Sequence, residues 1–144
     1  MLVKKSQFSK YQNIFLQKIK ATPHTIGLET VSPQTSTSAD FSIENFVGDN
    51  IRTSKTIELQ ALYEKEISTR TREKYGLPIE VNGIVYLSPK QLVPLFGDYH
   101  LDWNRTKIHF QGRIQVIERI IYLEEMYDSC IGLQIFVKDD SRGG

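Results

Sequence analysis

Hydrophobic and polar residues alternate most regularly over Thr106 to Val137, TKIHFQGRIQVIERIIYLEEMYDSCIGLQIFV. The alternation is interrupted at Gln111-Gly112, which indicates a hairpin, and again in the loop 124–129. Four apolar residues at every second position then define one face of a further strand: Ile131, Leu133, Ile135 and Val137. The pattern predicts three consecutive antiparallel strands, enough to hold a core if one face is apolar.

Three upstream segments have the same period and predict further strands: His24 to Val31, Thr56 to Tyr63 and Ile79 to Leu87. Their spacing predicts a shared core made of Ile57, Leu59, Ile108, Phe110, Ile114, Val116, Leu133 and Ile135. About six short strands joined by turns favour a mainly β fold, a small antiparallel β-barrel or sandwich with an N-terminal amphipathic helix and long loops. We expect a single domain over 1–144, with the barrel at 24–138.

Helical periodicity occurs at residues 6–20, where apolar side chains recur every three or four positions: Phe8, Tyr11, Phe15 and Ile19. We expect this amphipathic helix to dock on the core or on a neighbouring subunit, and Pro23 to stop it. Ser88 resembles an N-cap with Pro89 at the first helical position, which predicts one short helical turn that Pro94 ends.

The segment 32–54 is rich in Ser and Thr and reads as a long surface loop. It contains four apolar residues that need to be buried: Phe41, Ile43, Phe46 and Val47. Two interpretations stay open, docking of this loop on a partner and packing of its side chains under the loop's own domain.

The segment 64–78 joins two predicted strands with far more residues than a hairpin needs. Its β-branched residues favour a strand that continues out of the core as an arm, which Gly76 and Pro78 turn back; a solvated helix is the alternative. Four cations lie on it: Lys65, Arg70, Arg72 and Lys74. With Glu64, Glu66 and Glu73 interspersed, they form either a mixed solvated face or a surface for a subunit or DNA.

Composition and charge exclude several classes. Of the 144 residues, 18 are basic and 17 acidic, so a net charge of +1 provides no global attraction to nucleic acid or anionic lipid. The single cysteine, Cys130, permits no internal disulfide and favours a reducing compartment. Neither a signal peptide nor a transmembrane stretch is visible, so we expect a soluble protein without membrane contact.

Catalytic and cofactor motifs are absent from the sequence. No glycine-rich phosphate loop occurs, and the three histidines lack metal-ligand spacing, so we expect no cofactor, no metal and no enzymatic activity. A small enzyme would have to rely on His100, Asp102 and Glu118. An OB-like nucleic-acid-binding module would stack bases on Tyr63, Tyr86 and Phe110, which lack a basic groove in the sequence.

The order of elements resembles the head-closure, or stopper, proteins in the neck of tailed bacteriophages. The resemblance is carried by the arm-bearing hairpin 56–87, the short turn Ser88 to Leu92, the segment DWNRTKIHFQGRIQV (102–116) and the final strand CIGLQIFV (130–137). It covers residues 24–138 as a pattern and is not a specific motif, because tail-completion, terminator and other connector proteins have similar short strands.

That resemblance implies a structural virion protein that forms a homo-oligomeric ring of six or twelve subunits. Portal or adaptor proteins would lie above the ring and a tail terminator or tail-completion protein below it. The ring would close the head, retain the packaged double-stranded DNA without sequence specificity and provide the tail attachment surface. We expect the arm to project toward the ring axis, and the protein to be made in the host cytoplasm and to reside in the neck.

Overall fold

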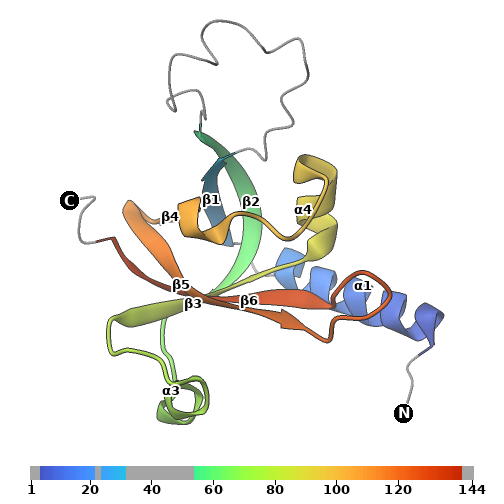
Figure 1. The fold of residues 1–144 in the computed structure, drawn as a ribbon, viewed down its shortest axis with the longest axis horizontal. Coiled ribbons are helices and arrows are strands. Elements are labelled where there is room, and N and C mark those ends of the chain that lie inside the picture. Colours follow the sequence, from blue (N-terminus) through green and yellow to red (C-terminus); the bar gives the residue numbers. More distant parts are fainter. Residues whose placement is uncertain (1–3, 22–23, 32–53, 141–144) are drawn as a thin grey trace, which may run out of the picture.

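The computed structural model describes residues 4–21, 24–31 and 54–140, and six antiparallel strands in it form a closed barrel (Figure 1). The strands are β1 His24–Val31, β2 Ser54–Glu64, β3 Val81–Leu87, β4 Lys107–Phe110, β5 Arg113–Leu123 and β6 Gly132–Asp139. The helices are α1 Lys5–Ala21, α3 Thr69–Tyr75, α4 Pro89–Phe96 and the 3-10 turn η3 Trp103–Arg105. The predicted fold class, a small β-barrel with an N-terminal helix, is confirmed.

The barrel consists of two three-stranded meanders, β1-β2-β3 and β4-β5-β6. They join where β3 pairs with β6 and where β1 pairs with β4, so the chain must cross from β3 to β4 through α4 and η3. The closing seam is short: residues 27–29 of β1 pair with residues 107–109 of β4. The β2–β3 pairing is equally short, over residues 62–64, so parts of the edges of β1 and β2 have no partner strand among the described residues.

The core fills the barrel with the inward side chains of all six strands. Of the predicted core residues, Ile108, Phe110, Leu133 and Ile135 are buried, and Leu59 packs against them while partly exposed. Ile57 is partly exposed and does not belong to either core cluster.

Ile114 and Val116 were wrongly placed in the core. Ile108 pairs with Gln115, so it is the glutamine that points inward, and it is 1% exposed. Because successive strand residues face opposite sides, Ile114 and Val116 lie on the outer face, opposite His109 and Lys107 respectively. A shift of one residue reverses the face of every side chain on a strand.

Helix α1 packs against β2, β3 and β6 and agrees with the predicted helix. Its buried residues are Phe8, Gln12 and Ile19, whereas Tyr11 is exposed, so the predicted apolar stripe was wrong at that position. Two hydrogen bonds compensate for the burial of the polar Gln12: its Nε2 donates to Ser129 Oγ and to the Cys130 carbonyl, each at 2.8 Å.

Helix α4 starts as predicted, with Pro89 in the first turn and a capping box between Ser88 and Gln91. It does not end at Pro94. That proline lacks only one backbone donor, and the helix continues to Phe96 before Gly97 takes a left-handed conformation and donates its N–H to the Val93 carbonyl.

Residues 65–80 do not form the extended arm that we predicted. We call this segment the α3 excursion. Ser68 caps a helix by accepting the N–H of Thr71, and Gly76 ends it in the left-handed conformation. Three apolar residues of the excursion, Ile67, Tyr75 and Leu77, pack against a second cluster on the outside of the barrel, formed by Val81, Ile84 and Phe136. These side chains hold the excursion on the barrel, below β3 in Figure 1.

The predicted docking loop lies outside the described residues, apart from Ser54 at the start of β2. The role of Phe41, Ile43, Phe46 and Val47 therefore stays a prediction.

Candidate functional site

Arg72 maintains the fold of the α3 excursion. Its guanidinium donates to the carbonyl of Pro78 at 3.1 Å and to that of Val81 at 2.8 Å, and so ties α3 to the start of β3. Both acceptors are neutral carbonyls, so Arg72 keeps its positive charge while its side chain is held against the end of the excursion.

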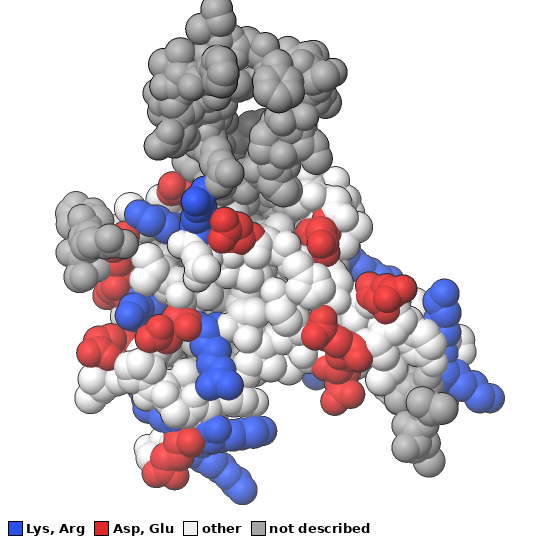
Figure 2. All heavy atoms as spheres, in the orientation of Figure 1, with Lys and Arg blue, Asp and Glu red and all other residues white. Residues whose placement is uncertain are grey.

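Of the other three predicted cations, Lys65 lies near the barrel residue Phe110, whereas Arg70 and Lys74 both lie on α3. Lys65 Nζ is 6.0 Å from the Phe110 ring centroid, and Lys74 Nζ is 5.2 Å from that of Tyr75. Arg70 and Lys74 are one helical turn apart on α3, hence on one face, and both are exposed. Figure 2 shows Lys and Arg side chains extending from the lower end of the molecule, with acidic side chains beside them. Of the four cations that the sequence grouped together, only Arg70 and Lys74 thus form a shared exposed face.

An exposed isoleucine lies at the C-terminal end of the same excursion, two residues before β3. Ile79 is 86% exposed, by far the most of the large hydrophobic side chains in the described residues. Its exposure was not predicted from the sequence, because the alternation places Ile79 at the start of a strand that in fact begins two residues later, at Val81. Its position directly after Pro78 was the available signal for a turn.

A groove between α1 and α4 lies at the other end of β3. It encloses about 380 Å³ and is lined by Gln12, Pro89, Lys90, Val93, Pro94 and Ser129. Large hydrophobic side chains on α1 and α4 remain exposed: Tyr11, Ile14, Val93 and Leu95. Of these, Val93 lines the groove together with Pro94, and the other three lie elsewhere on the two helices. Exposed apolar groups on neighbouring elements are typical of a surface that contacts another protein.

An acidic hollow adjoins this groove and shares Ser129 with it. The hollow measures about 560 Å³ and is lined by Asp98, Tyr99, His100 and the β5–β6 turn from Glu125 to Ser129. Three of its lining residues are carboxylates: Asp98, Glu125 and Asp128.

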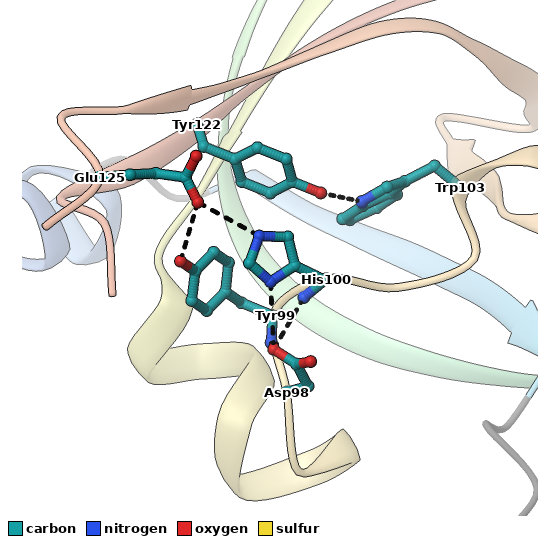
Figure 3. Close-up of polar contacts among 6 residues, drawn as sticks. All are labelled: Asp98, Tyr99, His100, Trp103, Tyr122 and Glu125. Carbon is teal, nitrogen blue, oxygen red and sulfur yellow. Dashed lines mark hydrogen bonds and ion pairs between the residues drawn. The ribbon is translucent and has the colours of Figure 1, made fainter. Parts of the chain in front are cut away.

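His100 stands at the centre of the hollow, between two of the carboxylates (Figure 3). Its Nδ1 is 3.4 Å from Asp98 Oδ1, and its Nε2 is 3.2 Å from Glu125 Oε2. Tyr99 donates its hydroxyl to the same Glu125 oxygen at 3.1 Å. The imidazole also packs on the ring of Tyr122, whose hydroxyl accepts the indole N–H of Trp103. These contacts fasten the crossover segment 97–106 to the β5–β6 turn.

The pKa directions agree with this bonding pattern. The backbone N–H of His100 holds the pKa of Asp98 below its ordinary value, so this carboxylate stays ionised. Burial, followed by the bond to Glu125, raises the pKa of Tyr99, so its hydroxyl stays protonated and able to donate.

The contacts of His100 hold two segments of the fold together. The two carboxylates approach opposite nitrogens of the His100 ring and cannot meet at one ion, and nowhere in the described residues do three suitable ligands group around a metal position. Asp102 pairs with Arg105, and Glu118 with Lys138, so the three residues considered for an enzyme are not brought together.

The aromatic residues considered for base stacking are not on one surface either. Tyr63 and Phe110 stack at 4.0 Å between centroids and are buried in the barrel, while Tyr86 lies outside it, bonded to Gln134. A platform for single-stranded nucleic acid needs exposed rings beside one another.

No protein-family model matches this sequence, and no curated protein matches it. Among the residues that the structure describes, no helix is long and apolar enough to cross a membrane.

Proposed function

We propose that this chain is a structural assembly protein of the head-closure type, which forms a homo-oligomeric ring in the neck of a tailed bacteriophage. The observation that carries the proposal is the pairing of a closed barrel with exposed apolar groups at both ends of β3. Closure of the sheet gives a compact body to which α1, α4 and the α3 excursion are attached, and these attached elements carry most of the exposed large apolar side chains described.

The element order supports the same proposal. The hairpin β2–β3, the short helix α4 after it and the final meander β4-β5-β6 follow one another in the order in which the sequence resembles head-closure proteins, with helix α3 in place of the extended arm. In such a ring, the mixed charges of the α3 excursion would let duplex DNA pass without strong retention. Portal or adaptor proteins above and a tail-completion protein below are the proposed neighbours.

Electron microscopy of the purified chain, alone and mixed with the portal protein from the same genome, tests this function. We expect a ring with an open centre that adds one layer to the portal. A chain that forms no ring and adds nothing to the portal would overturn the proposal, and a ring that instead binds the end of an isolated tail would identify a terminator.

A further inference from the structure

Ile79 and the α1–α4 groove lie at opposite ends of one strand. Ile79 precedes the first residue of β3 by two positions, and Pro89, in the groove wall, follows the last one by two. A strand of this length spans about 20 Å. One molecule therefore cannot place its own Ile79 in its own groove, and Figure 1 shows α3 and α4 well separated.

The two surfaces match in polarity. Ile79 is the most exposed large apolar side chain described, and Val93 and Pro94 provide apolar groove wall at exposed positions. Placing the isoleucine in the groove removes apolar area of both partners from water, which is the main favourable contribution to association.

The charges beside the two surfaces match as well. Arg70 and Lys74 share an exposed face of α3, and the acidic hollow that adjoins the groove presents Asp98, Glu125 and Asp128. Next to Ile79 lies the exposed Glu80, and the groove is lined by Lys90. Glu66 and Glu73 also lie on the excursion and lower its net positive charge. The charges therefore match only when the face with Arg70 and Lys74 is turned toward the acidic hollow.

We propose that the α3 excursion of one copy of this chain docks in the α1–α4 groove of the next, with Ile79 in the groove and Arg70 and Lys74 toward the acidic hollow. The inference rests on the self-assembly part of the proposed function and assigns its subunit interface. Because the two patches differ, the contact is head-to-tail and propagates around a ring or along a filament.

Two substitutions separate the two halves of the contact: Ile79→Asp disables the excursion and Val93→Asp disables the groove. Sedimentation velocity is measured for the wild type, each variant and their equimolar mixture, and Asn104→Asp, an exposed site on η3, serves as a charge-matched control. We expect concentration-dependent oligomers for the wild type and the control, and monomers for each variant alone.

The mixture gives the decisive result. The intact excursion of Val93→Asp fits the intact groove of Ile79→Asp, and no further contact is possible, so we expect a one-to-one dimer and nothing larger. Both altered side chains are exposed, so each variant should melt at the temperature that the wild type shows at concentrations where it is monomeric. A wild-type monomer at all concentrations, unimpaired assembly of either variant, or a mixture that stays monomeric would each overturn the interface.

The charged half is tested by Arg70→Glu against Lys65→Glu, which makes the same charge change elsewhere on the excursion. We expect the first to weaken association at least fivefold at low salt and the second to leave it nearly unchanged; equal weakening would contradict the assignment.

Oligomers that form as predicted but never enter a phage neck would refute the proposed function and leave this interface standing. A ring that still forms on the portal with Ile79→Asp would refute this interface and leave the proposed function standing.

Discussion

A single buried glutamine, Gln115, shows which side chains point inward at the start of β5. Gln115 accepts the Tyr63 hydroxyl on Oε1 at 2.7 Å and donates from Nε2 to Asn82 at 2.9 Å, so both ends of its amide are satisfied inside the barrel. Alternation of polar and apolar residues assigns a glutamine to the solvent side, and this is why Ile114 and Val116 were mistaken for core. Only the pairing partner, Ile108, reveals the true face.

The first residue-scale prediction concerns that bond. Tyr63→Phe keeps the stacked ring against Phe110 but leaves the buried Gln115 oxygen without its hydroxyl donor, which costs about 1–3 kcal/mol. Equilibrium urea unfolding should show a lower midpoint at an unchanged slope.

Two comparison variants complete that test. Tyr11→Phe removes a hydroxyl from an exposed ring on α1 and should leave the midpoint unchanged. Adding Gln115→Leu to Tyr63→Phe removes the stranded acceptor as well and should recover part of the loss. If Tyr63→Phe unfolds at the wild-type midpoint, the buried bond does not contribute to stability.

At the scale of elements, period-two and helical patterns predicted α1 and every strand in the part of the chain that the structure describes, because those elements bury one face each. The α3 excursion was assigned to extended backbone on the β-branched residues Ile67, Thr69 and Thr71. Its caps decide otherwise: Ser68 before the helix and Gly76 after it are a start and a stop with seven helical residues between them. In an exposed short helix, capping and docking on an outside cluster outweigh a small difference in propensity.

The docking of α1 supplies an element-scale prediction. Gly132 on β6 lies against the ring of Phe15, and a methyl group at this position would overlap that ring. Gly132→Ala should therefore displace α1 and destabilise the fold by about 1–3 kcal/mol. Thermal unfolding measures the loss.

A double-mutant cycle attributes the effect to this contact. Phe15→Ala alone removes packing, but in its presence Gly132→Ala should cost far less than it does in the wild type. Additive losses would mean that Gly132 is needed for another reason, such as the backbone of β6.

At the scale of the whole molecule, the closure of the barrel depends on pairing between distant strands, which the alternation of polar and apolar residues does not encode. Barrel and sandwich were equal expectations, and the three-residue seam between β1 and β4 selects the barrel. The candidate interface was equally hidden, since Ile79 was read as part of a strand and Val93 as part of a helical turn. Their exposure, 86% and 44%, appears only once the elements pack and leave them uncovered.

Locating the chain in assembled particles tests the central claim most directly. Phage particles are produced with a short epitope tag after Gly144, labelled with gold-conjugated antibody and imaged. The account predicts label at the junction of head and tail, and, in particles made without the chain, heads that lose their DNA and carry no tails. Tagged infectious particles that contain no copy of the chain, or carry it only on the capsid surface or the distal tail, would contradict it.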